Sequence, residues 1–315
     1  MSALGWSSTT DEVLAERDLT GLTVFITGAN SGLGQETARA MAAKGAHVVM
    51  AGRDQAKLDA AVAAIRASLP EASLETIICD LGNLAQLRAC GAEARARLAK
   101  IDLLINNAGV MAPPLSRTAD GFEMQLGTNH FGHFALTAEL LPLIEAGSAK
   151  RIVNLSSRGH HFAPVNLEDP HYEARAYDPW ESYGHSKTAN ILFTVGLEAR
   201  LAGRGIHAYA VHPGGIQTNL GRHMTEEMIA ALMARVTSSD SGFAWKTIPQ
   251  GAATSCWAAT APEIEGKGGV YCEDCHVAEV DDVSSTGGVR SYALDPATAD
   301  KLWALSEELT GARYA

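Results

Sequence analysis

The chain has 315 residues, of which 46% are hydrophobic and 19% charged, proportions typical of folded globular proteins rather than disordered, fibrous or membrane-spanning ones. This length suits one large α/β domain or two small ones. The formal net charge of -11 disfavours nucleic acids and anionic membranes as partners, because binding to either depends largely on Lys and Arg. We therefore expect a small-molecule partner.

Residues 1–20 are expected to form an N-terminal extension ahead of the fold. They lack the basic and apolar regions of a secretory signal, and no run approaches about 18 apolar residues. The five scattered cysteines fit a reducing compartment better than a disulfide framework. These features predict a cytoplasmic location.

After this extension, short β-rich runs alternate with longer segments of helical period, a pattern that predicts βαβ units and a parallel sheet. The expected strands are 22–27, 47–51, 74–79, 101–106, 151–155, 206–211 and 269–271. The main expected helices are 35–44, 56–69, 84–100, 122–144 and 182–202. Because no linker interrupts the series, residues 21–315 are predicted to form a single doubly wound Rossmann domain. We expect a parallel sheet of about seven strands and a substrate-loop insertion at about 219–246.

The first expected strand runs into a glycine-rich turn that reads Gly28-Ala29-Asn30-Ser31-Gly32-Leu33-Gly34. A strand, a glycine turn and a helix in this order aim backbone N–H groups and a helix dipole at a pyrophosphate. Gly28 permits the tight turn, Gly32 lets the backbone approach the phosphates, and Gly34 lets the helix pack on the strand. The turn therefore predicts a dinucleotide site, although an isolated glycine trio also occurs in ordinary turns.

Five further motifs follow in chain order. They are Asn106-Asn107-Ala108-Gly109, Asn129, Ser157, Tyr183-Gly184-His185-Ser186-Lys187 and His212-Pro213-Gly214. Together with the glycine turn, they resemble the short-chain dehydrogenase/reductase family over about residues 21–271. The segments 151–157 and 183–193 look most like the retinol dehydrogenase-like, broad-specificity branch of that family.

Tyr183 and Lys187 are four residues apart on an expected helix, so their side chains leave one face and can touch. A tyrosine of ordinary pKa near 10 needs about 4 kcal/mol of differential stabilisation of its phenolate to titrate near pH 7. An ammonium at about 4 Å in a partly dry site supplies energy of that order. An isolated pair would indicate only a helix edge, but the other motifs make Tyr183 the predicted general acid/base.

The resemblance implies roles for further residues. Ser157, with Ser156 as the alternative, would donate a hydrogen bond to the substrate oxygen. Asn129 would bind a water that links Lys187 to solvent, unless it is an ordinary helix asparagine. The expected contacts of the dinucleotide are Gly28, Asn30, Ser31, Gly32, Leu33, Gly34, Arg53, Asp80, Leu81, Asn107, Ala108, Gly109, Tyr183, Lys187, Pro213, Gly214, Ile216 and Thr218.

The same resemblance implies an NAD(P)-dependent oxidoreductase that interconverts a secondary or primary alcohol and its ketone or aldehyde. Enone reductases, epimerases and dehydratases of the same fold stay open, as does a non-catalytic sensor that binds NADP. Relatives are commonly dimers or tetramers, so a homo-oligomer also stays open.

The choice of cofactor depends on the end of the second strand, which reads Gly52-Arg53-Asp54. An acid here would bind a free 2′-hydroxyl and repel a phosphate, whereas a base would pair with the 2′-phosphate. Gly52 occupies the position where NAD-preferring relatives usually carry the acid, and Arg53 follows it. We therefore predict NADP, with NAD as the alternative through Asp54 unless that residue only caps the next helix.

Two late segments bear on the substrate and on metals. The insertion contains large apolar residues, namely Met224, Met228, Ile229, Met233, Phe243 and Trp245. It predicts a lid over a bulky apolar substrate, or a helix that packs on the core or on another subunit. Cys272, Cys275 and His276 match a haem-attachment pattern, but they end an expected core strand, and the histidines lack zinc-site spacing. We predict no metal.

Overall fold

Eight strands form one sheet in the computed structural model, which describes residues 4–217, 220 and 244–314. Their order is β3-β2-β1-β4-β5-β6-β7-β8, with β8 antiparallel to β7 and every other neighbouring pair parallel. The strands are β1 (Thr23–Thr27), β2 (His47–Gly52), β3 (Leu74–Ile78), β4 (Leu103–Asn106), β5 (Arg151–Leu155), β6 (His207–His212), β7 (Val270–Glu273) and β8 (His276–Val277). The predicted doubly wound sheet is confirmed, and its seven expected strands lie within two residues of their predicted ends. The two-residue β8 was not predicted.

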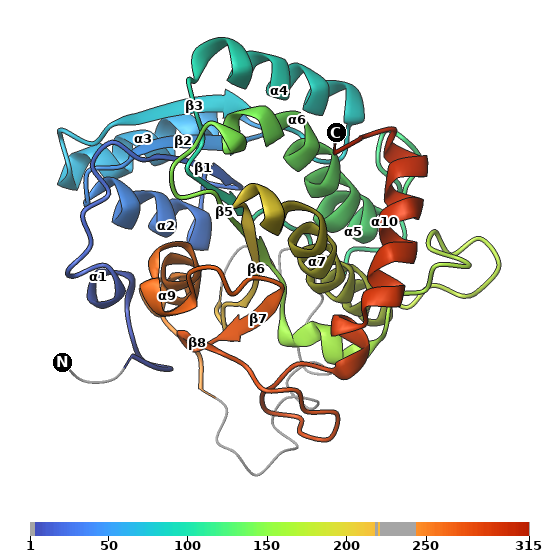
Figure 1. Cartoon of the computed structure of the whole chain (residues 1–315). Helices are drawn as coiled ribbons and strands as arrows, with labels where there is room; N and C mark the ends of the chain where they lie inside the picture. The colour runs from blue at the N-terminus through green and yellow to red at the C-terminus, as the bar shows by residue number, and fades with distance from the viewer. Residues whose placement is uncertain (1–3, 218–219, 221–243, 315) are drawn as a thin grey trace.

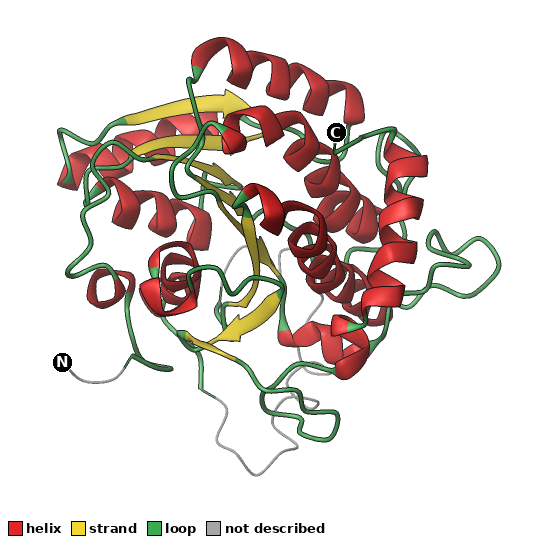
Figure 2. Ribbon diagram, in the orientation of Figure 1, coloured by secondary structure: helices red, strands yellow, loops and turns green. Residues whose placement is uncertain are grey.

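Helices cover both faces of this sheet (Figures 1 and 2). One face carries α2 (Gly32–Ala42), α3 (Gln55–Ser68) and α9 (Ile248–Thr260). The other carries α4 (Leu84–Arg97), α6 (Gly132–Glu145) and α7 (Pro179–Leu201), with α10 (Pro296–Thr310) packed on α7. The short helical elements are α1 (Thr10–Val13), α5 (Met124–Leu126), the π-helical turn η1 (Gly127–Phe131), and the 3-10 turns η2 (Arg158–Phe162), η3 (Ala202–Arg204), η5 (Pro262–Ile264) and η6 (Ser291–Leu294).

Local capping explains where several helices begin. In α3, α4, α7, α9 and α10, the side chain of the N-cap residue accepts hydrogen bonds from backbone N–H groups of the first turn. These N-cap residues are, in order, Asp54, Asn83, Asp178, Thr247 and Asp295. Helix α9 was not predicted, although Thr247 and Gln250 form a capping box before an apolar run. Helix α7 begins three residues earlier than expected because Asp178 caps it and Pro179 fits its first turn.

The expected helix 122–144 is interrupted. The chain forms α5, then the π-helical turn η1, and then α6. A π-helical turn places one more residue in the turn than an α-helix does, and such turns frequently occur at functional sites. Here the turn carries Asn129.

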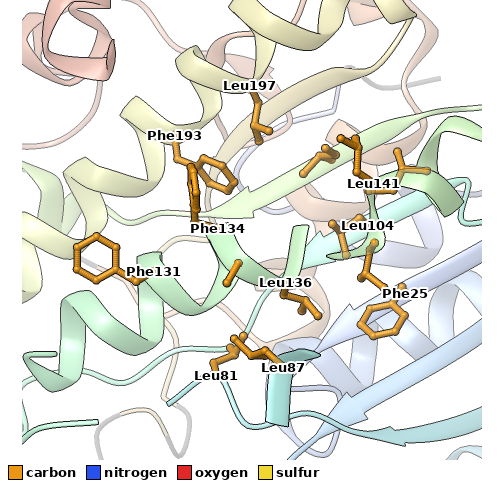
Figure 3. Packing of buried hydrophobic residues seen from close by; sticks show 14 of the residues in the cluster. Phe25, Leu81, Leu87, Leu104, Phe131, Phe134, Leu136, Leu141, Phe193 and Leu197 are labelled. Atoms are coloured by element: carbon orange, nitrogen blue, oxygen red, sulfur yellow. The ribbon is translucent and has the colours of Figure 1, made fainter. Parts of the chain in front are cut away.

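Aromatic packing fixes the position of α7. The ring of Phe134 in α6 lies 5.4 Å from that of Phe193 in α7 and 5.0 Å from that of Trp303 in α10, measured between centroids. Figure 3 shows Phe134 and Phe193 side by side within this core. Burying each large apolar side chain contributes roughly 1.5–3 kcal/mol. The helix that carries Tyr183 and Lys187 is therefore held firmly against the sheet.

The structure describes most of the N-terminal extension but little of the expected insertion. Residues 4–20 pack on the domain, since α1 contacts α9 and the Gln250 side chain donates a hydrogen bond to the Ser7 carbonyl at 3.1 Å. The expected insertion falls outside the described residues except for 220 and 244–246. Among the helices in the described ranges, none combines the length and apolar character that crossing a bilayer requires.

Candidate active site

The glycine turn lies between β1 and α2, against the end of β4. Gly28 has a φ of 65°, and a Cβ there would lie 2.9 Å from the Ala108 Cα atom. A Cβ on Gly34 would lie 2.5 Å from Asn107 Nδ2, which donates a hydrogen bond to the Thr27 carbonyl at 2.8 Å. Glycine is therefore required at both positions, because any side chain would separate the turn from β4.

The N-terminus of α2 lacks the side-chain cap that α3, α4, α7, α9 and α10 have. Ser31 occupies the cap position of α2 but makes no side-chain hydrogen bond to the first turn. Gly32, the first helical residue, has a φ of 56°. The N–H groups of this turn therefore lack a side-chain cap and can receive an anion.

The adenosine ribose of the cofactor is expected at the end of β2. Gly52 is tightly enclosed, because a Cβ there would lie 3.3 Å from both Asn30 Oδ1 and Leu58 Cδ2. Arg53 is exposed and makes no ion pair with any described residue. Asp54 caps α3 by accepting a hydrogen bond from the Lys57 N–H at 3.2 Å, and it pairs with the Lys57 ammonium at 3.5 Å.

Two other expected cofactor residues, Asp80 and Leu81, follow β3. Asp80 Oδ1 accepts a hydrogen bond from the Gly82 N–H at 2.9 Å, which shapes the turn after the strand. Leu81 is buried in the core, and a Cβ on Gly132 would come 2.9 Å from its own Cβ. The structure therefore gives Leu81 a packing role.

The end of β4 brings the glycine turn next to the expected catalytic residues. Thr27 Oγ1 accepts hydrogen bonds from the N–H groups of Asn107 at 2.9 Å and Ala108 at 3.0 Å. A Cβ on Gly109 would lie 3.2 Å from Asn129 Oδ1 and 3.7 Å from Lys187 Nζ. Motifs that are distant in sequence thus meet at one edge of the sheet.

Asn129 is buried within the π-helical turn, and its side chain is almost fully hydrogen-bonded. Its Oδ1 accepts from the Val110 N–H at 2.8 Å, while its Nδ2 donates to the Val110 carbonyl at 3.0 Å and to Ser186 Oγ at 2.9 Å. The Asn129 carbonyl oxygen lies 2.9 Å from His133 Nδ1. The bonds of the Asn129 amide therefore fix the shape of the π-helical turn.

Ser157 and Tyr183 face one another across the end of β5. Ser157 Oγ accepts a hydrogen bond from the Gly159 N–H at 3.0 Å, and the Ser157 hydroxyl opposes the rise that burial causes in the pKa of Tyr183. A Cβ on Gly159 would lie 2.6 Å from Tyr183 Cε1, so the turn after Ser157 lies directly on the phenol ring. Ser156 points elsewhere, because its hydroxyl donates to the Lys187 carbonyl at 2.8 Å.

Lys187 lies over the ring of Tyr183, and its ammonium is hydrogen-bonded to a backbone carbonyl. Lys187 Nζ donates a hydrogen bond to the Leu155 carbonyl at 3.0 Å and lies 5.6 Å from the centroid of the Tyr183 ring. Burial lowers the pKa of Lys187 to about 8. Burial also raises the pKa of Tyr183 to about 12, although the Ser157 hydroxyl opposes that rise. Desolvation of the phenolate is thus the larger of the two effects.

The segment after β6 lies beside the glycine turn. A Cβ on Gly251 in α9 would lie 2.6 Å from Ile216 Cγ1 and 2.8 Å from Leu33 Cδ2, which places these two side chains together. Gly214, which follows Pro213, has a φ of 96°. Thr218 lies outside the described residues.

Lys246 supports this segment, a role that no sequence motif indicates. Its side chain is 1% exposed and pairs with Asp274 at 2.5 Å, while its backbone N–H donates to the Gly215 carbonyl at 2.9 Å. Breaking a buried pair of this kind leaves an uncompensated charge, so such pairs hold their backbone firmly.

The segment from Cys272 to His276 is a strand end and a tight turn. Cys272 lies in β7, and Asp274 and Cys275 have positive φ angles of 47° and 60° in the turn to β8. Both cysteines are free and buried, and burial raises the pKa of Cys275 to about 11. Within the ranges that the structure describes, no three His, Cys, Asp or Glu side chains gather to hold a metal ion.

Comparison with known proteins identifies relatives along nearly the whole chain. The model of the short chain dehydrogenase family matches residues 22–229. A Streptomyces lividans protein named "Probable oxidoreductase" is 43% identical over 91% of this chain and 96% of its own length. Human retinol dehydrogenase 12 is 40% identical over 94% of this chain and 88% of its own length. The crystal structure of an uncharacterized protein from Mycobacterium paratuberculosis is 36% identical, with a TM-score of 0.75 over 98% of this chain and 99% of that chain.

Proposed function

Because the chain belongs to the short-chain dehydrogenase/reductase family, and its similarity to retinol dehydrogenases confirms the expected branch, we propose that it interconverts an alcohol and its ketone or aldehyde. Members of this family are oxidoreductases that bind a nicotinamide dinucleotide. The observation that carries the proposal is the placement of Tyr183 against the turn that follows Ser157, with Lys187 one helical turn away.

The residues of the glycine turn fit a dinucleotide. The uncapped N-terminus of α2 would hold the pyrophosphate, because its N–H groups and helix dipole favour an anion. Gly109, at the end of β4, lies next to Asn129 and Lys187. The nicotinamide end of the cofactor would therefore lie beside the proposed catalytic residues. A bound nicotinamide would supply the hydride donor or acceptor.

The proposed mechanism gives each catalytic side chain a separate role, and Tyr183 alone transfers a proton. Ser157 Oγ accepts the Gly159 N–H, and its own hydrogen would be donated to the substrate oxygen when the substrate is bound. Tyr183 transfers its phenol proton to that oxygen during reduction and removes it during oxidation. Lys187 favours the phenolate through its charge and would hold the cofactor ribose. Asn129 fixes the π-helical turn and, through Ser186, the helix that carries both residues.

We infer a bulky apolar substrate from the composition of residues 224–245. Large apolar residues, including Met224, Phe243 and Trp245, occur there in the sequence, after the segment that follows β6. In doubly wound folds, the carboxyl ends of the strands form the ligand crevice. Such residues would exclude water from the carbonyl group during hydride transfer.

A panel of carbonyl compounds tests the proposed reaction. The purified protein with NADPH should convert a bulky apolar aldehyde or ketone into its alcohol, and with NADP⁺ it should carry out the reverse oxidation. Products should be identified by mass spectrometry against ketone, alcohol and enone substrates. Saturation of enones alone would indicate a double-bond reductase instead. Tight NADPH binding without any turnover would favour a non-catalytic sensor.

We propose NADP as the cofactor, because the end of β2 offers a base and lacks a free acid. Arg53 is exposed and makes no ion pair within the part of the chain that the structure describes. Asp54, the residue that would favour NAD, is engaged as the cap of α3 and in its pair with Lys57. A 2′-phosphate at this edge would therefore meet a guanidinium that is available to bind it.

Replacing Arg53 with Ala should raise the KM for NADPH by about tenfold or more, because a charge-assisted hydrogen bond contributes roughly 1.5–3 kcal/mol. The KM for NADH, measured on the same variant, should stay within about twofold and serves as the internal control. Steady-state kinetics with both cofactors provides the measurement. If wild-type protein preferred NADH, the assignment of NADP would be wrong.

A further inference from the structure

The buried histidine His133 connects the two halves of the site. It lies in the first turn of α6, directly after the π-helical turn, and is 1% exposed. Its Nδ1 atom lies 2.9 Å from the Asn129 carbonyl oxygen, and its Nε2 atom lies 2.9 Å from Thr27 Oγ1. Thr27 is the last residue of β1 and immediately precedes the glycine turn.

The partners of His133 determine which nitrogen carries the proton. A carbonyl oxygen can only accept, so Nδ1 must be the donor toward Asn129. Burial, together with the nearby charge of Lys187, lowers the pKa of His133 to about 4, although the bond to Asn129 opposes that change. The ring is therefore neutral at pH 7, and its Nε2 accepts the hydrogen of the Thr27 hydroxyl.

The direction of the remaining bonds follows from this assignment. While the Thr27 hydroxyl donates to His133, its oxygen accepts the N–H groups of Asn107 and Ala108. A directed chain of hydrogen bonds thus runs from the end of β4, through the end of β1, to the carbonyl of Asn129. Thr27, His133 and Asn129 are each at most 1% exposed, so water cannot readily replace a lost partner.

We propose that His133 is a positioning residue, which fixes the glycine turn of the cofactor site relative to Asn129 and the catalytic helix. Without the imidazole, the Thr27 hydroxyl would keep only the Ile105 carbonyl as an acceptor, at the longer distance of 3.5 Å, and the Asn129 carbonyl would lose a donor in a dry environment. Both groups would then find new partners by moving. The proposal rests on the proposed function, but cofactor binding tests it without any substrate.

The chain offers a matched control for this role. His130 lies in the π-helical turn, three residues before His133, and is equally buried. Its Nε2 atom lies 2.8 Å from Ser306 Oγ in α10, away from the cofactor turn, and burial lowers its pKa to about 3. Both histidines are thus neutral and buried, but only His133 touches the two halves of the site.

The experiment compares His133→Leu with His130→Leu by fluorescence titration with NADPH, by kcat on the best carbonyl substrate, and by melting temperature. We expect His133→Leu to weaken the Kd for NADPH about tenfold and to lower kcat at saturating cofactor about tenfold. His130→Leu should lower the melting temperature but leave both other values within about twofold. Equal losses of Kd and kcat in the two variants, or no loss in either, would overturn the proposal.

A conservative variant separates positioning from general destabilisation. In His133→Asn, the amide takes the place of Nδ1–H, so the bond to Asn129 can persist while the bond to Thr27 is lost. We expect kcat near the wild-type value with a weakened Kd for NADPH. Should His133→Leu fail to fold, Thr27→Val removes the same bond from its other end. The double variant Thr27→Val/His133→Asn should then weaken the Kd for NADPH by less than the product of the single effects, and independent effects would contradict the coupling.

Failure of this proposal and failure of the proposed function can be told apart. If the carbonyl panel gave no turnover, the titrations with NADPH would still report on His133. If the panel gave turnover while His133→Leu bound NADPH and turned over normally, only the inference about His133 would be wrong.

Discussion

Replacing Tyr183 with Phe should lower kcat for carbonyl reduction by about 10³-fold, while the Kd for NADPH stays within about twofold of the wild-type value. General acid catalysis by a positioned side chain typically contributes 10²- to 10⁴-fold, and this variant removes the only transferable proton of the residue. The ring itself remains, so packing against the turn at Gly159 is preserved. Single-turnover and steady-state kinetics at saturating NADPH provide the measurement.

Tyr209→Phe is the matched control for this prediction. Tyr209 is fully buried in β6, and its hydroxyl donates to the Ile264 carbonyl at 2.8 Å, away from the site. Removing that hydroxyl should cost about 1 kcal/mol of stability and leave kcat unchanged. A Tyr183→Phe variant with normal turnover would rule out the proposed proton donor.

Strands β1 to β7 could be predicted from the sequence because each is a short apolar run of the parallel part of the sheet, whereas β8 is two exposed residues long. Val24, Val48 and Leu104 belong to such runs and are completely buried. The ends of the helices were harder to predict, because individual capping side chains determine where a helix begins. The sequence 122–144 has a continuous helical period, and nothing in that period reveals the π-helical turn at Asn129, which depends on hydrogen bonds to Val110.

The sequence predicts which residues belong to the candidate site, but not which atoms they contact. Family motifs identify Ser157, Tyr183 and Lys187, and the structure gathers them at the ends of β4 and β5. The four-residue spacing predicts that Lys187 and Tyr183 share a helix face, but not that the Leu155 carbonyl binds the ammonium. The sequence does not predict His133 as a site residue, because only the fold brings its partners Thr27 and Asn129 next to it.

Lys187→Met should lower kcat for reduction by about 10²-fold and remove its dependence on pH near 8. Burial lowers the pKa of Lys187 from its ordinary value of 10.5 to about 8, so its charge is present below pH 8 and is lost as the pH rises through that value. When Tyr183 gives up its proton, the phenolate needs that charge. Wild-type kcat for reduction should therefore fall above about pH 8, while the variant stays slow at every pH.

The same substitution should change stability in the opposite direction. The unfolded chain holds the Lys187 proton up to about pH 10.5, whereas the folded chain releases it near pH 8. Between these values the unfolded state binds more protons, so this group makes the wild type more stable as the pH rises. At pH 7 the buried ammonium is a cost, and Lys187→Met should raise the melting temperature while lowering kcat. A variant that loses both stability and activity would indicate a structural role for Lys187 instead.

The double variant Tyr183→Phe/Lys187→Met decides whether the lysine acts through the tyrosine. If its charge serves the Tyr183 phenolate, the double variant should be no slower than Tyr183→Phe alone at saturating NADPH, because residues that act as a unit are non-additive. Multiplication of the two losses would instead mean that Lys187 contributes independently, through the cofactor ribose or the substrate. The pH profile of Tyr183→Phe is the companion measurement, and it should lack the decline near pH 8.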